Sequence, residues 1–348
     1  MSEKMKAGRA GSPVDAVLRL CGRPGAVAIL MQDNPDPDAL GSAAALRELI
    51  RARLGKRVMI GYGGVCGRAE NRAMIDILRL DGRRVTPAHL DKYRTLCLVD
   101  CQPHAGNNLL RADREADVVI DHHLLPRRKP WTAAFADVRP EYGATATILY
   151  EYLNAAGVEI DANLATAMFY AIQSDTQDLG REAEPADVRA YQELFSLADK
   201  KKLARIRHAP VQADYFKMFA DSLANCVVAG KTVVSWIPAC NNVDVIAEVA
   251  DRMMRLDGMQ AAVCYGACAN TLYLSARATD ARGNVARRIK RVVRNLGTGG
   301  GHATMAGGQV PLNSDGEKRT ALVRARILSV FAPNQEPAPL LAGPAKRR

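Results

Sequence analysis

Acidic residues and histidines occur at the ends of four apolar or turn-forming segments of this 348-residue chain. Asp36 and Asp38 are separated by one proline, and Asp100 ends an apolar run. His122 belongs to an Asp-His-His triplet, and Asp175 closes a long, largely apolar stretch. Carboxylates gathered in one place repel one another and raise their own pKa values unless a cation lies between them. The four segments therefore predict a metal site, provided that the fold brings them together.

The ligand types predict which metal this site would bind. A site made mainly of carboxylate oxygens suits a hard divalent ion, and one imidazole nitrogen shifts the preference from Mg²⁺ towards Mn²⁺. Two such ions, about 3.5–4 Å apart, need one shared carboxylate and together activate water for attack on a phosphate ester. We therefore expect two Mn²⁺ ions, with Mg²⁺ or Co²⁺ as alternatives, and hydrolysis of a phosphate ester.

The first half of the chain must position these residues. Short apolar runs alternate there with helical patterns, which favours a parallel sheet with helices on both faces. In an open parallel sheet, ligands bind at the carboxyl ends of the strands, where three of the four acidic segments are expected. We predict strands at 26–31, 57–62, 95–99 and 118–120 and helices at 39–54 and 71–80.

The second half predicts a separate, smaller α/β domain. Helical patterns over 143–173 and 185–202 are followed by three strand-like runs around another helical pattern. An active-site cleft is expected between the two domains. The predicted organisation is a flexible N-terminus at 1–13, a catalytic domain at 14–199, a linker at 200–223, the smaller α/β domain at 224–333 and a disordered basic tail at 334–348.

Composition narrows the location and the partners. Eight cysteines without a Cys-x-x-Cys pair, and no apolar leader, predict a reduced, cytoplasmic protein. No run approaches the roughly 20 apolar residues of a membrane span, so no membrane partner is expected. The net charge of +11 favours polyanionic partners, whereas aromatic residues make up only 5% of the chain. Few aromatics argue against a long single-strand platform and favour small substrates.

A glycine-rich segment, Gly61-Tyr62-Gly63-Gly64, follows the second predicted strand. Its spacing differs from the Gly-x-Gly-x-x-Gly pattern of dinucleotide-binding loops, and no acidic residue ends a strand about 20 residues later. We therefore interpret it as a turn between a strand and a helix.

Taken together, the motifs resemble those of the DHH phosphoesterases, named for the triplet that is Asp121-His122-His123 here. The family's motif His-x-x-Pro-Asp-x-Asp-Ala-x-Gly-Ser corresponds to 32–42, and its other acidic motifs correspond to 98–100 and 174–176. The C-terminal half resembles the DHH-associated domain with its Gly-Gly-Gly-His loop, here 299–302. The resemblance covers most of the chain. It is strongest to the nanoRNase and phosphoadenosine-phosphate phosphatase branch.

The resemblance implies a role for each motif residue. Asp36 and Asp38 would each bind one ion, and Asp100 would bridge the two ions. His122 and Asp175 would complete the set of ligands around the second ion. Asp100 and His123 would act in catalysis, with His123 facing the phosphate and Asp121 orienting a histidine. The substrate-binding residues would be His123, Arg277, Gly299, Gly300, Gly301 and His302.

One position departs from the family pattern. The histidine that leads the first motif, a ligand of the first ion, is replaced by Gln32. An amide oxygen is a poorer ligand for manganese than imidazole is. We therefore expect weaker binding of the first ion, with Asp33 as a ligand through water, rather than loss of function.

The expected function is hydrolysis of short single-stranded RNA (nanoRNA), of 3′-phosphoadenosine 5′-phosphate, or of both. Cyclic or linear dinucleotides are alternative substrates, and a homodimer is an open alternative to a monomer. The Gly-Gly-Gly-His loop argues against a pyrophosphatase, and the short chain argues against a processive exonuclease. A nucleotide-binding sensor is the alternative from another class. Asp100 argues against it, because a pure binder needs no bridging carboxylate.

Overall fold

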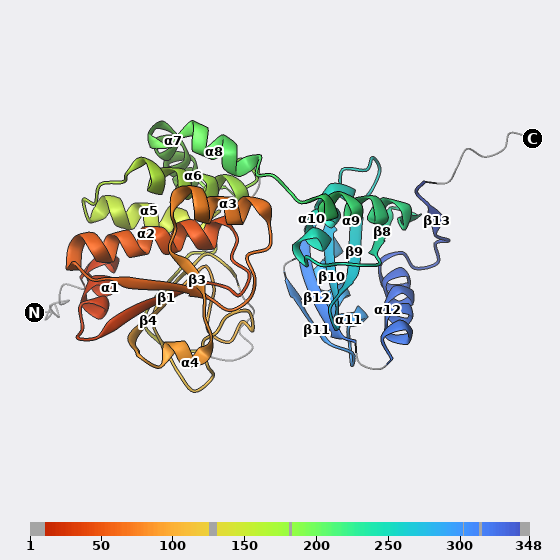
Figure 1. The fold of residues 1–348 in the computed structure, drawn as a ribbon, viewed down its shortest axis with the longest axis horizontal. Helices are drawn as coiled ribbons and strands as arrows, with labels where there is room; N and C mark the ends of the chain where they lie inside the picture. The colour runs from red at the N-terminus through yellow and green to blue at the C-terminus, as the bar shows by residue number, and fades with distance from the viewer. Residues whose placement is uncertain (1–10, 125–130, 181–182, 302, 313–314, 342–348) are drawn as a thin grey trace, which may run out of the picture. The chain divides into compact units, whose positions relative to one another are not determined.

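The computed structural model describes residues 11–124, 131–180, 183–301, 303–312 and 315–341. The chain forms two compact units, Met1–Ala209 and Pro210–Arg348 (Figure 1). The boundary lies within the range 200–223 that was predicted to be a linker. Most of that range is helical: α8 (Lys200–Arg207) packs against α3 and α6, and α9 (Ala213–Ala224) packs against β8 and α10.

The first unit is built on a six-stranded sheet in the order β3-β2-β1-β4-β5-β6. Every neighbouring pair is parallel, which confirms the predicted α/β fold. The chain order reverses between β1 and β4, which is the point where parallel sheets of this type bind ligands. The strands are β1 (Ala26–Leu30), β2 (Val58–Tyr62), β3 (Gly82–Arg84), β4 (Tyr93–Val99), β5 (Ala116–Asp121) and β6 (Ala133–Val138).

Helices cover the two faces of this sheet unequally. One face lies under α2, α5 and α6 (Figure 1), whereas the other is covered by α4 and by loop residues such as Leu109. The stretch predicted as one helical region, 143–173, is two helices, because the chain turns at Gly157 with a φ of 59°. The helices are α1 (Pro13–Cys21), α2 (Pro37–Leu54), α3 (Ala69–Leu78), α4 (Pro87–Leu90), α5 (Thr145–Ala155), α6 (Ala162–Asp175) and α7 (Pro185–Leu197).

The contact between α2 and α6 brings two acidic motifs together. Asp36 precedes the first residue of α2, and Asp175 is the last residue of α6. A Cβ atom at Gly41 of α2 would lie 3.0 Å from the carbonyl oxygen of Ala167 and 2.8 Å from the Cβ of Ala171 on α6. Glycine is therefore required for this close approach.

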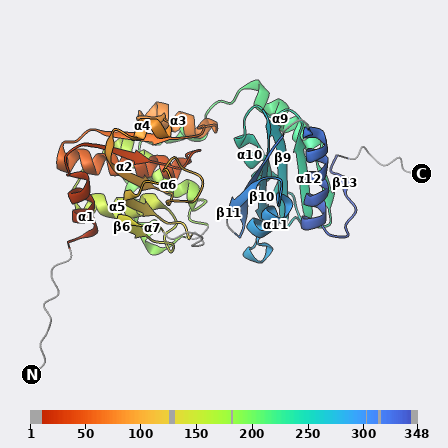
Figure 2. The same cartoon turned by 90° about the horizontal axis from the view of Figure 1, so that it is seen from below.

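The second unit contains a seven-stranded mixed sheet in the order β11-β12-β10-β9-β8-β7-β13, in which only β8 and β9 are parallel. Helices α9 and α10 pack on one apolar cluster, and α11 and α12 pack on another (Figure 2). This confirms the second, smaller α/β domain. Its elements are β7 (Val227–Ala229), β8 (Thr232–Ile237), α10 (Asp244–Met253), β9 (Ala261–Cys268), β10 (Thr271–Ala278), η1 (Ala281–Gly283), α11 (Val285–Val292), β11 (Thr298–Gly301), β12 (Met305–Pro311), α12 (Gly316–Phe331) and β13 (Ala338–Pro339).

The predicted flexible ends fall partly outside the described residues, which exclude 1–10 and 342–348. Helix α1 begins at Pro13, and β13 pairs with β7, so the start of the predicted tail is attached to the second sheet. Within the described part of the chain, no helix combines the length and the apolar character needed to cross a membrane.

Candidate metal centre

The first acidic motif lies where β1 ends and α2 begins. Asp36 caps α2, and its Oδ1 accepts a hydrogen bond from the amide of Ala39 at 3.0 Å. Asp38 is 1% exposed and accepts hydrogen bonds from the amides of Thr145, at 2.7 Å, and Ala146, at 2.9 Å. These two amides belong to the start of α5. Each carboxylate is therefore held at a helix N-terminus, where the amides and the helix dipole favour negative charge.

Asp100 lies directly after β4, beside the end of β5. Its φ is 56°, a left-handed conformation that costs a non-glycine residue about 1–3 kcal/mol. Its Oδ1 accepts a hydrogen bond from the hydroxyl of Thr145 at 3.1 Å. Thr145 therefore contacts both Asp38 and Asp100, one through its backbone and one through its side chain.

His122 presents an unbonded nitrogen to this cluster. Its Nδ1 lies 3.0 Å from the carbonyl oxygen of Tyr142, and a carbonyl only accepts, so Nδ1 carries the proton. The buried Nε2 makes no hydrogen bond, although Asp175 Oδ2 is 3.1 Å away. Asp100 Oδ1 lies 3.8 Å and Asp38 Oδ2 lies 4.0 Å from the same nitrogen. This nitrogen, surrounded by three carboxylates, fits a metal ion.

Two overlapping groups have the spacing of metal ligands. Asp38, His122 and Asp175 form one, and Asp100, His122 and His123 form the other, with all ligand atoms of a group within 4.8 Å of one another. Both groups combine carboxylate oxygens with imidazole nitrogen, the donor set expected for a divalent ion such as Mn²⁺. The fold thus brings together residues that are far apart in the sequence.

Repulsion among the buried carboxylates of the candidate metal centre also indicates that a cation binds there. Burial and, after it, the negative charge of Asp175 raise the pKa of Asp38 to about 7. Burial and the neighbouring carboxylates Asp36 and Asp38 also raise the pKa of Asp100. Burial alone would lower the pKa of His122, but Asp175 and Asp38 raise it to about 10. Without a metal ion the cluster therefore retains protons, which a bound ion would displace.

Gln32 lies on the Asp36 side of the cluster. Its Nε2 donates to Asp36 Oδ2 at 2.9 Å and approaches Asp100 Oδ2 at 3.4 Å. Asp36 belongs to neither of the two ligand groups among the described residues. The neighbouring Asp33 has a buried Oδ1 without a hydrogen-bond partner, and burial raises its pKa. The side predicted to bind the first ion thus contains an amide donor where the family has an imidazole.

The triplet's other two residues form a rigid pair. His123 Nδ1 lies 2.8 Å from Asp121 Oδ1 and 3.5 Å from Asp100 Oδ1. Gln102 donates from Nε2 to Asp121 Oδ2 at 2.6 Å and to the carbonyl oxygen of His123 at 2.8 Å. Asp121 is fully buried, so these bonds fix its orientation and that of the His123 ring.

Three residues of the site were missed by the sequence analysis: Gln102, Tyr142 and Thr145. Thr145 follows Gly143 and precedes an apolar helical pattern, so its place near a helix start was readable from the sequence. Its contact with Asp38 could not be predicted from the sequence, because the two residues are 107 positions apart. Tyr142 acts through its backbone carbonyl, which no side-chain pattern reveals.

The remaining predicted site residues lie in the second unit. Arg277 of β10 is held by Asp251 of α10, with Nε 2.5 Å from Asp251 Oδ1, and its Nη1 donates to Ser275 Oγ at 2.8 Å. His302 lies outside the described residues.

The predicted glycine loop is largely a strand in the structure. Gly299, Gly300 and Gly301 form most of β11, which pairs antiparallel with β12. A Cβ at Gly299 would lie 2.8 Å from Cγ2 of Ile289, so glycine permits α11 to pack closely on this strand. Packing therefore accounts for at least one glycine of the motif.

Comparison with known families identifies both halves of the chain. Residues 26–172 match the model of the DHH family, N-terminal domain, and residues 229–329 match the DHHA1 domain. An uncharacterized protein of Methanocaldococcus jannaschii is 35% identical over 318 residues, which cover 88% of this chain and 64% of that protein. A "probable manganese-dependent inorganic pyrophosphatase" of Bacillus cereus is 30% identical over 176 residues, 50% of this chain and 55% of that protein. The chain thus spans less than two thirds of the length of these relatives.

Solved structures share the fold. An exopolyphosphatase-related protein from Bacteroides fragilis has a TM-score of 0.67 at 14% identity and covers 93% of this chain and 97% of its own. RecJ from Thermus thermophilus, solved in complex with Mn²⁺, has a TM-score of 0.50 at 16% identity over 92% of this chain and 55% of its own. At these identities the likeness concerns the fold alone.

Proposed function

Because the chain belongs to the DHH family, with a DHH N-terminal domain followed by a DHHA1 domain, we propose that it is a metal-dependent phosphoesterase. The two matches confirm the predicted resemblance to the DHH family and to its associated domain, whereas the nanoRNase branch is part of the proposal. One observation carries the proposal: the buried, unbonded Nε2 of His122 is surrounded by the carboxylates of Asp38, Asp100 and Asp175. The pyrophosphatase relatives, whose names state manganese dependence, support a divalent ion.

We propose two ions, preferably Mn²⁺. Asp38, His122 and Asp175 would hold one, and Asp36 and Asp100 would hold the other, with Gln32 as a weak additional ligand. Divalent ions bound there supply positive charge to a phosphate and lower the pKa of water. Asp100 would be shared by the two ions.

The surrounding residues prepare the site for a phosphate. Thr145 and the start of α5 fix Asp38 and Asp100, and the bond from His122 Nδ1 to Tyr142 directs Nε2 at the carboxylates, where a metal ion would displace its proton. Burial lowers the pKa of His123, but its bond to Asp121 raises it above the ordinary value overall. In its protonated form His123 would donate a hydrogen bond to a phosphate oxygen, while Asp121 positions it.

The proposed substrates are short single-stranded RNA (nanoRNA) and 3′-phosphoadenosine 5′-phosphate. The net charge of +11 supports an anionic substrate, and Arg277 and residues 299–302 of the DHHA1 domain are the proposed substrate-binding residues outside the metal centre. We propose a cytoplasmic location on the ground of the eight cysteines, for which the structure shows no disulfide among the described residues. A homodimer is a further proposal, to be tested by size-exclusion chromatography with light scattering.

Gln32 favours a second candidate function, a nucleotide-binding sensor with weakened catalysis. Its amide donates to Asp36 and Asp100, the carboxylates that would hold the first ion. A sensor would bind nucleotides without turning them over.

A substrate panel tests the proposal. Initial rates with Mn²⁺ should be measured for a 5′-phosphorylated RNA dinucleotide, 3′-phosphoadenosine 5′-phosphate, a cyclic dinucleotide and inorganic pyrophosphate. We expect the first two to have the highest kcat/KM. Faster hydrolysis of pyrophosphate would contradict the proposed substrate class, and binding of nucleotides without hydrolysis of any compound would favour the sensor.

A further inference from the structure

A pocket of about 320 Å³ opens where β2 and β3 end. This volume lies near the lower end of the range for small-molecule sites, about 300–1,000 Å³. The residues that define its chemistry are Tyr62, Cys66, Arg72, Ile75, Asp76 and Arg84.

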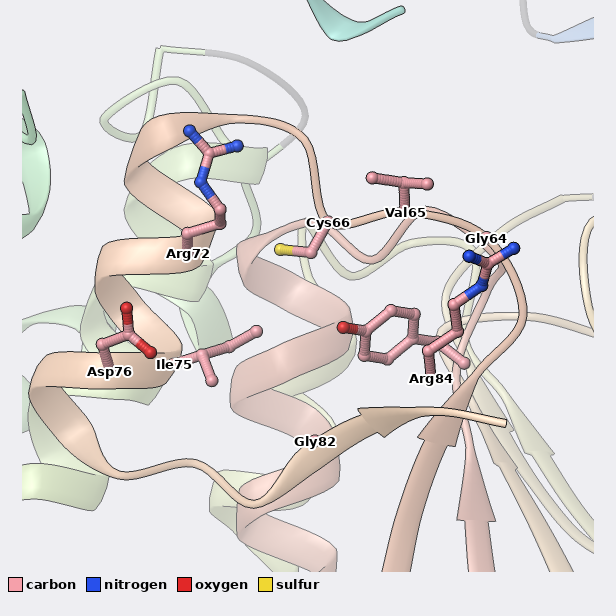
Figure 3. A pocket seen from close by; sticks show the side chains of 9 residues that line it. Gly64, Val65, Cys66, Arg72, Ile75, Asp76, Gly82 and Arg84 are labelled. Carbon is pink, nitrogen blue, oxygen red and sulfur yellow. The ribbon is translucent and has the colours of Figure 1, made fainter. Parts of the chain in front are cut away.

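Three charged side chains surround this pocket. Arg72 and Asp76 lie one turn apart on α3, and Arg84 lies on the opposite side, on β3, with its guanidinium beside Gly64 (Figure 3). The two guanidiniums donate to the carbonyl oxygens of Gly67 and Gly63, which leaves further N–H groups for a ligand. Within the described parts of the chain, none of the three makes an ion pair. Two cations and one carboxylate thus line one pocket.

The space between these charges is lined by less polar groups. Cys66 lies between Arg72 and Arg84 in Figure 3, and Ile75 lies below Arg72, beside Asp76. The ring of Tyr62 is half-buried, and burial raises its pKa, so its hydroxyl stays neutral. A flat heterocycle can lie against such a surface while its polar edge reaches the charged groups.

Two residues that line the pocket, Gly64 and Val65, are hydrogen-bonded to the loop that leads to Asp36 of the metal centre. The amide of Gly64 donates to the carbonyl oxygen of Asp33 at 2.7 Å, and the amide of Val65 donates to Asn34 Oδ1 at 2.9 Å. A Cβ at Gly64 would lie 2.4 Å from Asn34 Oδ1, so only glycine fits there. The segment predicted as a strand-to-helix turn therefore joins the pocket to the loop that ends at Asp36.

We propose that this pocket binds a nucleoside 5′-monophosphate unit. The base lies between Tyr62 and Ile75, its amino group donates to Asp76, and its phosphate is bound by Arg84, with Arg72 adding positive charge. Adenine and other bases with an amino group fit this arrangement better than uracil, which has none. The inference rests on the proposed function in one respect: the unit belongs to the phosphodiester that the metal centre cleaves.

Direct binding tests the pocket without catalysis. Calorimetric titration of the full chain with AMP in EDTA should show binding that Arg84→Ala weakens about tenfold, the effect of one charged hydrogen bond. Asp76→Asn should weaken AMP but leave UMP unchanged. Arg83→Ala is the matched control, because Arg83 is the adjacent β3 residue and approaches Tyr93 Oη at 3.4 Å. AMP binding that is absent from the native chain, or equal in Arg84→Ala, would overturn the proposal.

Hydrolysis then shows whether the ligand is part of the substrate. Arg84→Ala should raise KM for a 5′-phosphorylated RNA dinucleotide about tenfold and leave hydrolysis of bis(p-nitrophenyl) phosphate, a diester without a nucleoside, unchanged. An unchanged KM would contradict a substrate role even if AMP binds. If the native chain hydrolyses neither compound, the proposed function fails, and the AMP titration still decides whether the pocket binds nucleotide.

Discussion

The side-chain amide of Gln32 donates to Asp36 Oδ2 at 2.9 Å. In the family motif a metal-binding histidine occupies the position of Gln32, so a hydrogen-bond donor here faces the carboxylate that would bind the first ion. Opposite this pair, His122 has the free nitrogen that Gln32 lacks. The two halves of the centre are therefore unequal, and the first prediction follows from this difference.

Gln32→His should strengthen binding of the first ion. Imidazole is a better ligand for manganese than an amide is. We expect the affinity for Mn²⁺ to rise about tenfold or more, because mutation of residues that only hydrogen-bond to metal ligands already changes metal affinity about 10–100-fold. Isothermal titration calorimetry with Mn²⁺ measures this change in affinity. Gln260→His, which adds an imidazole at an exposed position of the second unit, is the control. Unchanged metal dependence in Gln32→His would contradict the assignment of this position.

Thr145→Val should reduce activity by about tenfold, because Asp100 would lose a charged hydrogen bond from a hydroxyl 3.1 Å away. The backbone bond to Asp38 would remain, so the variant isolates the side chain. Thr145→Ser restores the hydroxyl and should recover most of kcat. Equal loss in both variants would contradict this role of the hydroxyl, because serine keeps the hydroxyl that valine lacks.

Mn²⁺ affinity should rise with pH. The pKa of Asp38, raised to about 7, and that of His122, raised to about 10, mean that the metal-free site holds protons at neutral pH. Binding must release them, so the dissociation constant should fall as pH increases from about 6 to 8. Titrations in buffers of different ionisation enthalpy count the released protons. Binding that releases none, with a constant affinity, would be inconsistent with this cluster.

Asp187→Ala should destabilise the first unit. Asp187 is fully buried and accepts hydrogen bonds from the amides of Gly143 and Glu184, both at 2.8 Å, and from the hydroxyl of Thr147. Leaving these donors unpaired should lower the free energy of unfolding by about 2–4 kcal/mol. Urea denaturation measures it, with exposed Asp113→Ala as the control. A change below about 0.5 kcal/mol, the range of ordinary surface substitutions, would rule out this anchoring role.

Sequence patterns were sufficient for the parts of the fold that depend on local chemistry. Apolar runs that end in acidic residues located β1, β4 and β5, and therefore Asp36, Asp100 and His122 at one sheet edge. Neither edge strand was predicted: β3 (Gly82–Arg84) has no apolar pattern, and β6 (Ala133–Val138) has no fully buried residue.

Contacts between segments that are distant in the sequence could not be predicted from sequence patterns alone. The bonds of Thr145 to Asp38 and Asp100 depend on how α5 meets two other elements. Gln102 supports Asp121 from 19 residues away, across two strand ends. The strand conformation of Gly299 also could not be predicted, because glycine occurs both in loops and at close packing contacts.

The most direct test of the central claim is hydrolysis of a 5′-phosphorylated RNA dinucleotide in Mn²⁺ and in EDTA, by the native chain, by Asp100→Ala and by the exposed control Asp257→Ala. We predict cleavage that requires Mn²⁺, disappears in Asp100→Ala and is unchanged in Asp257→Ala. Cleavage that persists in EDTA or in Asp100→Ala would contradict a metal-dependent phosphoesterase centred on these carboxylates.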